Sequence, residues 1–188
     1  MVKALDKVRL RYVIVGGVAV IVHGRPRTTT DLDLIVENDR ERLAKFLSEL
    51  KTQQFEVLDQ QVKAGLAEGA NISIFVKSSL LRIDLTVAMK RDELEALDSA
   101  IQTHFEDMIL NLASIDQVLY GKLLYLGDIE DVPEEELLEY NDVLDFLAIY
   151  LRNKDNINWD LLNRKATQQN LEKTLRCLQK LANKIELF

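Results

Sequence analysis

Hydrophobic and polar positions alternate in several short stretches of the first half of the chain. Residues 12–15 form a β-rich apolar run, and residues 31–36 begin with alternating polar and apolar side chains. The same two-residue period runs through residues 71–77 and 81–87, which are joined by the serines at 78–79. Because side chains in a strand alternate between two faces, these stretches predict strands, and the last two predict a hairpin.

A second pattern, in which apolar positions recur every three or four residues, predicts helices. The predicted helical segments are residues 3–11, 18–23, 39–51, 114–126, 134–151 and 168–186. Strands and helices mix at first and helices alone follow, so we expect an α+β fold, with a mixed sheet flanked by helices and then a C-terminal helical part. We expect one domain over residues 1–112 and a second over residues 113–188.

The composition is that of an ordinary globular protein, because 47% of the 188 residues are hydrophobic and 29% are charged. The single cysteine, Cys177, excludes an internal disulfide and a cysteine-rich zinc site. No apolar run reaches the roughly 20 residues that span a bilayer, and the N-terminus lacks the pattern of a secretory signal. We therefore expect a cytoplasmic protein that makes no membrane contact.

The net charge of -7 is unevenly distributed along the chain. Residues 92–145 hold 16 acidic side chains and one basic side chain, Lys122, whereas the segments before and after are both net basic. Such an acidic segment is typical of a solvated surface, and it also fits a docking surface for a basic partner. The overall negative sign argues against broad binding of nucleic acids.

Candidate chemistry begins with three carboxylates. Asp31 and Asp33 stand two residues apart on a predicted strand, so both side chains leave one face, and Asp84 lies on another predicted strand. Like charges on one face repel unless a cation lies between them, and oxygen donors alone suit Mg²⁺ or Mn²⁺ rather than zinc. Carboxylates from adjacent strands could hold two such ions for phosphoryl or nucleotidyl transfer. Taken alone, the pair also fits a half-exposed edge strand.

The pair Gly16-Gly17 follows the apolar strand at 12–15 and precedes a short predicted helix. Glycine lets the backbone approach a ligand closely, and a helix N-terminus offers free N–H groups to a phosphate. The alternative is a tight turn that needs a positive φ. The short length of chain between this pair and the carboxylate strand at Asp31 favours the phosphate-binding interpretation.

These features together resemble the DNA polymerase β-like nucleotidyltransferase superfamily, which combines a Gly-Gly or Gly-Ser turn, an Asp-x-Asp and a later strand carboxylate. Here thirteen residues separate Gly17 from Asp31. The stretch GGVAVIVHGRPRTTTDLDLIVE is more narrowly similar to small nucleotidyltransferases that include abortive-infection and toxin–antitoxin proteins. The similarity is close over residues 12–36, moderate over 81–87 and general in the C-terminal half.

The resemblance implies a role for each matching residue. Nucleotide binding would fall to Gly16, Gly17, Arg27 and Thr29, metal binding to Asp31, Asp33 and Asp84, and further catalytic roles to Asp84, Lys122 and Asp145. Asp84 would also help to activate the acceptor hydroxyl. Arg27 fits a surface salt bridge equally well, and we interpret His23 as a structural histidine at a helix end.

Lys122 falls within the apolar stripe of the predicted helix at 114–126, where an ammonium group needs a partner. That partner could be one of the three aspartates or a triphosphate, and the alternative is an ammonium that reaches solvent. The subfamily often combines such a lysine with an Asp-x-x-Asp on a following helix, here Asp142 and Asp145. Asp145 is the stronger candidate because it borders the apolar stripe of its own helix.

The leading hypothesis is a metal-dependent nucleotidyltransferase that moves a nucleoside monophosphate from an NTP to a hydroxyl acceptor. The acceptor could be RNA such as tRNA, a protein side chain or a small molecule, and the resemblance adds an antitoxin protein as a candidate partner. The alternative is a catalytically silent module that uses the same fold to bind a nucleotide or a partner protein.

Overall fold

The computed structural model describes residues 1–186, which fall into two compact units. The first unit comprises residues 1–19 and 28–114, and the second comprises residues 20–27 and the chain from residue 115 onward. The division expected from the sequence, after residue 112, does not anticipate that residues 20–27 group with the second unit.

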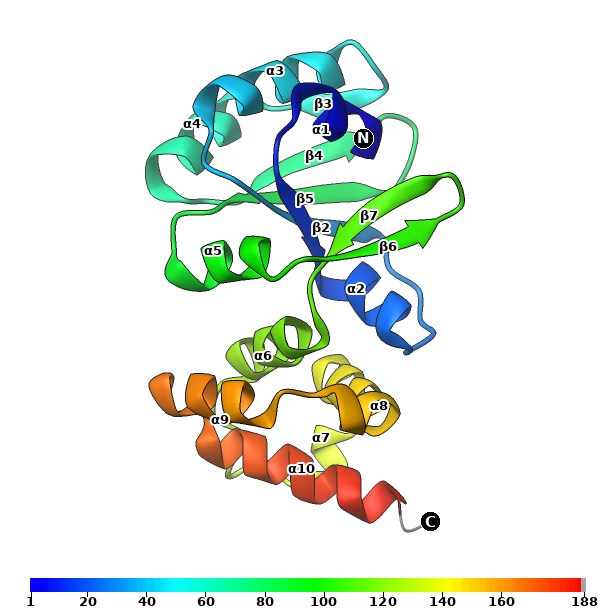
Figure 1. The fold of residues 1–188 in the computed structure, drawn as a ribbon, viewed down its shortest axis with the longest axis vertical. Coiled ribbons are helices and arrows are strands. Elements are labelled where there is room, and N and C mark those ends of the chain that lie inside the picture. The colour runs from blue at the N-terminus through cyan, green and yellow to red at the C-terminus, as the bar shows by residue number, and fades with distance from the viewer. Residues whose placement is uncertain (187–188) are drawn as a thin grey trace. The chain divides into compact units, whose positions relative to one another are not determined.

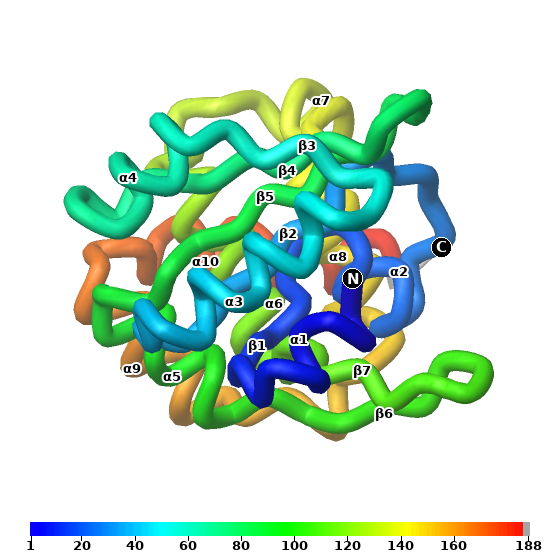
Figure 2. Tube along the Cα trace, turned by 90° about the horizontal axis from the view of Figure 1, so that it is seen from above, coloured from blue at the N-terminus to red at the C-terminus, as the bar shows by residue number. Residues whose placement is uncertain are grey.

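The first unit is built on a seven-stranded mixed sheet in the order β3-β4-β5-β2-β1-β7-β6, which can be followed across Figure 2. The strands are β1 (Tyr12–Val15), β2 (Asp31–Val36), β3 (Phe55–Val57), β4 (Ile72–Val76), β5 (Arg82–Val87), β6 (Ile101–Phe105) and β7 (Met108–Leu112). Strand β2 runs parallel to β5 and β1 runs parallel to β7, while the other neighbours are antiparallel. The observed mixed sheet confirms the predicted fold class.

One face of this sheet carries the hydrophobic core of the first unit. The buried residues on that face are Tyr12, Ile14, Leu34, Val36, Ile72, Ile74, Ile83, Leu85 and Val87. The covering helices are α1 (Val2–Val8), α3 (Arg40–Lys51) and α4 (Asp59–Glu68), which lie on the same side of the sheet in Figure 1. Helix α3 buries Leu43, Phe46, Leu47 and Leu50 at helical spacing. Because this face is apolar, the charged residues of the same strands point to the opposite face.

Helix α2 (Gly16–His23) begins directly after β1, and α5 (Arg91–Asp98) contacts β1 and β2. The helix predicted over residues 18–23 therefore starts two residues earlier, at the glycine pair. Side-chain capping explains where α3 begins, because Asp39 accepts a hydrogen bond of 3.0 Å from the backbone N–H of Arg42.

The second unit consists of helices, as predicted for the C-terminal part. They are α6 (Ile115–Leu126), α7 (Glu134–Leu137), α8 (Asn141–Asn153), the 3-10 helix η1 (Lys154–Asn156), α9 (Trp159–Gln168) and α10 (Glu172–Glu186). The prediction of one helix over residues 134–151 is wrong, because α7 ends at Leu137 and α8 begins at Asn141. Helix α9 was not predicted.

The apolar faces of these helices form a second core. Helix α8 contacts α6 and α10, and α9 contacts α6 and α10. Phe146, Leu147, Leu162 and Leu178 are buried among them. The rings of Tyr150 and Trp159 meet edge to face with centroids 5.3 Å apart.

Part of the acidic segment is neutralised inside this unit. Lys173 of α10 contacts Glu130 at 2.6 Å, and Lys184 contacts Glu134 at 2.6 Å. These pairs match acidic residues before α8 to the basic C-terminal helix, so not all of the acidic segment is available to a basic partner. None of the described helices is long and apolar enough to cross a membrane.

Candidate functional site

Strand register brings the three predicted carboxylates together on one face of the sheet. Strand β2 pairs in parallel with β5 so that Asp33 stands opposite Asp84. Asp31 lies two residues before Asp33 and therefore on the same face. Neighbouring strands lie about 4.8 Å apart, so the Asp33 and Asp84 side chains leave adjacent points of one surface.

Two residues that sequence reasoning missed hold these carboxylates. The Arg82 guanidinium bridges two of them, because its Nη2 atom lies 3.3 Å from Asp31 Oδ2 and 2.9 Å from Asp84 Oδ2. The Ser73 hydroxyl donates a hydrogen bond of 2.8 Å to Asp84 Oδ1. Both contacts follow from register, since Arg82 stands opposite Asp31 and Ser73 opposite Asp84. Within the sequence alone, the only signal for Arg82 was its place two residues before Asp84.

Asp33 lies against the first residue of helix α2. Gly16 adopts φ +59°, and a Cβ atom added there would lie 2.0 Å from Asp33 Oδ2 and 2.7 Å from Asp33 Cγ. Only glycine leaves room for this carboxylate. The partial positive charge of the helix N-terminus also favours an anion at this place. Gly16 therefore has both features considered from the sequence: a turn with positive φ, and a backbone that another group, here the Asp33 carboxylate, approaches closely.

Thr29 fixes the start of β2 through its hydroxyl. Thr29 Oγ1 lies 3.1 Å from the backbone carbonyl oxygen of Asp31 and 3.3 Å from the Asp31 backbone nitrogen. These contacts orient the strand that carries Asp31 and Asp33. A nucleotide contact for Thr29 stays a prediction.

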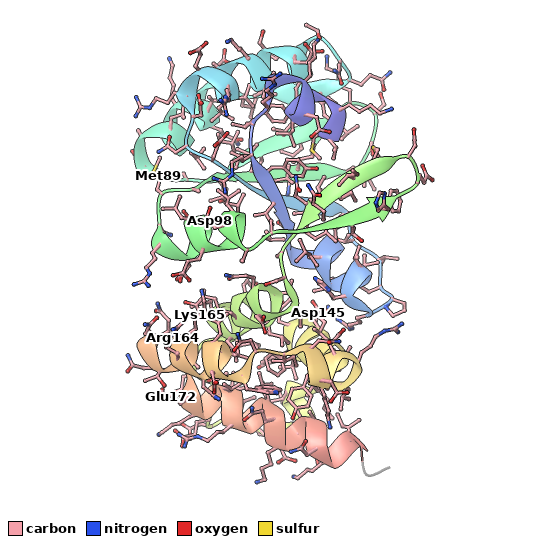
Figure 3. All side chains as sticks on the ribbon, in the orientation of Figure 1. Met89, Asp98, Asp145, Arg164, Lys165 and Glu172 are labelled. Carbon is pink, nitrogen blue, oxygen red and sulfur yellow. The ribbon has the colours of Figure 1, made fainter. Side chains whose placement is uncertain are left out.

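A second group of charged residues lies within the second unit, around Asp145 of α8, which Figure 3 labels. The Asp145 side chain is 1% exposed. Its Oδ1 atom contacts Arg25 and lies 3.4 Å from Arg27 Nε, and its Oδ2 atom lies 2.7 Å from Lys122 Nζ. Lys122 also donates a 2.6 Å hydrogen bond to Asp142 Oδ1. We call these five residues the cationic cluster, because three cations face two carboxylates.

The cationic cluster gives Lys122 the partner that its position on an apolar stripe requires. Lys122 is 8% exposed and is paired with Asp142 and Asp145, so its ammonium does not reach out to solvent. Arg27, whose side chain is 24% exposed, pairs with the buried carboxylate of Asp145 rather than with a surface carboxylate. Arg25 belongs to the same cluster and was not singled out from the sequence.

The loop that carries Arg25 and Arg27 is fixed at the end of α2. Gly24 has φ +123°, and a Cβ atom there would lie 2.2 Å from Arg152 Cδ. The Asn153 side chain donates a 3.1 Å hydrogen bond to the carbonyl oxygen of His23. These contacts agree with the interpretation of His23 as a structural residue at a helix end.

The described residues contain no group of three or more His, Cys, Asp or Glu side chains already arranged to hold a metal ion. At the sheet face, the guanidinium of Arg82 takes the place between Asp31 and Asp84. The donor set at this face is nevertheless oxygen-only, as Mg²⁺ and Mn²⁺ prefer.

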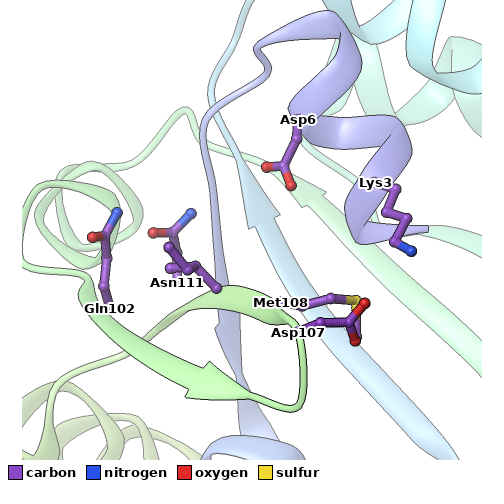
Figure 4. A pocket seen from close by; sticks show the side chains of 7 residues that line it. Lys3, Asp6, Gln102, Asp107, Met108 and Asn111 are labelled. Carbon is purple, nitrogen blue, oxygen red and sulfur yellow. The ribbon is translucent and has the colours of Figure 1, made fainter.

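A cavity of about 420 Å³ lies elsewhere in the first unit. It is lined by Lys3 and Asp6 of α1 and by Gln102, Asp107, Met108, Ile109 and Asn111 of the β6–β7 hairpin (Figure 4). None of the residues singled out from the sequence lines it.

Comparison with known proteins identifies the fold. No family model matches this chain, and no curated protein matches its sequence. The crystal structure of ANT(2″)-Ia in complex with adenylyl-2″-tobramycin has a TM-score of 0.59 and 15% identity, covering 90% of this chain and 92% of that one. A nucleotidyltransferase-like protein from Paracoccidioides brasiliensis has a TM-score of 0.56 and 18% identity, covering 97% of this chain and 89% of that one.

A third structure, lincomycin-bound LnuA, a lincosamide antibiotic adenylyltransferase, has a TM-score of 0.50 and 14% identity, covering 79% of this chain and 90% of that one. At these identities the likeness establishes the fold alone. The chain has the nucleotidyltransferase fold, as the resemblance found in its sequence implied.

Proposed function

We propose that this protein is a metal-dependent nucleotidyltransferase that moves a nucleoside monophosphate from an NTP to a hydroxyl acceptor. In that reaction the acceptor oxygen bonds to the α-phosphorus, the bond from that phosphorus to the bridging oxygen breaks, and pyrophosphate leaves with the bonding electron pair. The acceptor proton passes to a base. The single observation that carries the proposal is the pairing of Asp33 with Asp84, with Asp31 on the same face, beside the Gly16 turn of a nucleotidyltransferase fold.

The residues present fit a divalent cation. Three carboxylates share one face, and the position of the Arg82 guanidinium between two of them indicates that this face is stabilised by positive charge. Asp31, Asp33 and Asp84 would hold Mg²⁺ or Mn²⁺, which when bound would polarise the phosphoryl oxygens and lower the pKa of the attacking hydroxyl.

The surrounding residues of the first unit orient these carboxylates. Ser73 fixes one oxygen of Asp84, and Gly16 makes room for Asp33 at the start of α2. The backbone of Gly16 and Gly17 would then bind the triphosphate at this helix terminus, with Thr29 holding the start of β2. Asp84 would accept the acceptor proton.

The cationic cluster of the second unit suits an anionic part of a substrate. Its three cations outnumber its two carboxylates, and Arg27 Nε is buried without a hydrogen-bond acceptor. Arg27 and Lys122 would supply donors to phosphate oxygens. Because both oxygens of Asp145 already contact cations, we assign Asp145 the role of a positioning residue that keeps Arg25, Arg27 and Lys122 in place.

A small hydroxylated molecule is the acceptor class that the comparisons favour. ANT(2″)-Ia is bound to an adenylylated tobramycin and LnuA to lincomycin. The net charge of -7 weighs against a long nucleic acid. A tRNA or protein acceptor, an antitoxin partner and a cytoplasmic location rest on the sequence alone.

Transfer of a labelled nucleotide tests the proposal. The protein is incubated with each of four α-labelled NTPs, Mg²⁺ or Mn²⁺, and a panel of aminoglycosides, lincosamides, tRNA and proteins. Asp33→Asn is expected to lower any transfer by at least about a hundredfold, because it removes a metal-binding carboxylate. The matched control is Asp98→Asn, which changes an exposed aspartate of the same unit. Equal transfer by the wild type and Asp33→Asn would contradict the proposal.

The alternative is a silent binding module, motivated by the acidic segment between residues 92 and 145. The ion pairs of Glu130 and Glu134 with α10 weaken that motive. Calorimetry with Mn²⁺ and a non-hydrolysable NTP separates the two. Metal-linked nucleotide binding together with transfer of a labelled nucleotide favours the enzyme. Nucleotide binding without transfer, or no nucleotide binding together with co-purification of a basic protein, favours the module.

A further inference from the structure

Arg82 occupies an unusual position for a cation in a proposed metal site. It stands opposite Asp31 across the β2–β5 pair and two residues before Asp84 on its own strand, so all three side chains share one face. One nitrogen, Nη2, contacts both carboxylates, at 3.3 Å and 2.9 Å. The guanidinium therefore lies where a divalent cation would have to bind Asp31 and Asp84 together.

The contacts of Arg82 reduce the repulsion between the Asp31 and Asp84 carboxylates, but they leave one hydrogen-bond donor of the guanidinium without a partner. Its Nε atom is buried and has no hydrogen-bond partner among the described residues. A buried N–H without an acceptor is unfavourable, so the bridging position is held mainly by the charges of the two aspartates. The side chain is also 42% exposed, so a route out of the position is open to solvent.

We propose that Arg82 is a built-in counter-cation that a divalent metal ion must displace. In the metal-free protein it holds Asp31 and Asp84 close together and limits their repulsion. On metal binding, the guanidinium leaves both carboxylates and their oxygens become available to the ion. The inference rests on the proposed function, and it adds that metal affinity is set by competition between the ion and this side chain.

The size of this competition depends on how often Arg82 occupies the bridging position. An apparent dissociation constant equals the intrinsic one divided by the fraction of molecules in which the site is open. If Arg82 bridges the carboxylates in about 80–90% of molecules, its removal tightens metal binding roughly five- to tenfold. A purely structural salt bridge makes the opposite prediction, because its loss would disorder the carboxylates and weaken metal binding.

Calorimetric titration with Mn²⁺ alone, at low ionic strength, tests the inference on the full chain. The variant is Arg82→Gln, and Arg82→Lys keeps the charge without the planar fork. The matched control is Arg91→Gln, which removes an 83% exposed arginine paired with Glu95 in the same unit. A second readout is the thermal midpoint in EDTA and in saturating Mn²⁺.

Arg82→Gln is expected to bind Mn²⁺ roughly five- to tenfold more tightly than the wild type, while Arg82→Lys stays nearer to the wild type and Arg91→Gln is unchanged. In EDTA the thermal midpoint of Arg82→Gln is expected to fall below that of the wild type, and saturating Mn²⁺ should remove the difference. Tight binding by Arg82→Gln alongside undetectable binding by the wild type supports the inference further.

Failure of the inference differs from failure of the proposed function. If the wild type binds Mn²⁺, Asp33→Asn abolishes that binding, and Arg82→Gln binds equally or more weakly, then Arg82 is a structural bridge and the proposed function stands. If neither the wild type nor Arg82→Gln binds Mn²⁺ at millimolar concentrations, the metal-dependent function falls and the inference falls with it.

Discussion

Replacement of Gly16 by alanine separates the two reasons for a glycine at this position. Gly16 has φ +59°, so any other L-residue is strained there by about 1–2 kcal/mol. The new Cβ atom would in addition lie 2.0 Å from Asp33 Oδ2 and 3.1 Å from Asp33 Cβ. Since Oδ2 is the end of a rotatable side chain, we expect Asp33 to turn away rather than the sheet to open.

The expected loss of stability is the sum of the backbone strain at positive φ and the cost of displacing Asp33. Holding Asp33 away from its preferred rotamer adds about 0.5–1.5 kcal/mol, so Gly16→Ala should lower the free energy of unfolding by roughly 1.5–3.5 kcal/mol in total. The functional loss should be larger than the stability loss, because a displaced Asp33 no longer faces Asp84. We expect Mn²⁺ binding and nucleotide transfer to fall to the level of Asp33→Asn.

Two other glycines provide matched controls. Gly127 has φ +61° and an added Cβ atom would meet nothing within 4 Å, while Gly69 has φ +68° and would meet only Met89 Sδ, at 3.4 Å. Alanine at either position should therefore carry the conformational term alone, about 1–2 kcal/mol, and leave Mn²⁺ affinity intact.

Urea titration measures the stability of the three variants, and calorimetry measures their Mn²⁺ affinity. The reasoning about Asp33 is refuted if Gly16→Ala loses no more stability than Gly127→Ala and binds Mn²⁺ as the wild type does. If Gly16→Ala fails to fold, it is compared with Gly69→Ala, which lies in the same unit and also has a positive φ. A folded Gly69→Ala then shows that the positive φ alone does not prevent folding.

Three further predictions address other parts of the molecule. Asp145→Ala leaves three cations of the cationic cluster without their shared carboxylate, so we expect a loss of about 3–5 kcal/mol in urea titration. Asp142→Ala, at a carboxylate 26% exposed, should lose much less, and equal losses would contradict this account of the cluster. Ser73→Ala removes the 2.8 Å hydrogen bond that fixes Asp84, and transfer of labelled nucleotide should slow roughly tenfold; an unchanged rate would remove Ser73 from the site. Burial raises the pKa of the Tyr12 phenol, so the unfolded phenol ionises first. The stability this provides is intact below the ordinary tyrosine pKa and is lost as the pH rises through the folded pKa. As the pH rises from 9 to 11, the urea midpoint should fall less steeply for Tyr12→Phe than for the wild type. Equal slopes for the two proteins would contradict a raised pKa of the buried Tyr12 phenol as the cause.

Local pattern predicted the central elements of the fold well. Strands β1 and β2 have the bounds expected from sequence: β1 is an apolar run whose first three residues are buried, and β2 begins with alternating polar and apolar side chains. The hairpin of β4 and β5 was also predicted, and its turn places Ser78 at φ +60°. Strands β2, β4 and β5 carry their own signal, since burial on one face imposes a two-residue period.

Elements at the margins of the first unit were missed for a physical reason. Strand β6 lies at an edge of the sheet, and most of its side chains are exposed. Without a buried face, no alternation of hydrophobic residues is imposed on it. Pairing with β7 decides its conformation, and that pairing is invisible in the local sequence.

The sequence by itself determined which residues carry the candidate chemistry: the glycine pair, Asp31 and Asp33 at a two-residue spacing, Asp84, and a lysine on an apolar helix face. Each is a local property, fixed by backbone periodicity. Only the tertiary structure decided what these residues touch. Strand register set Arg82 between Asp31 and Asp84, and helix packing set Arg25 and Lys122 against Asp145. Such contacts join residues far apart in the chain, so they depend on packing that no local spacing encodes.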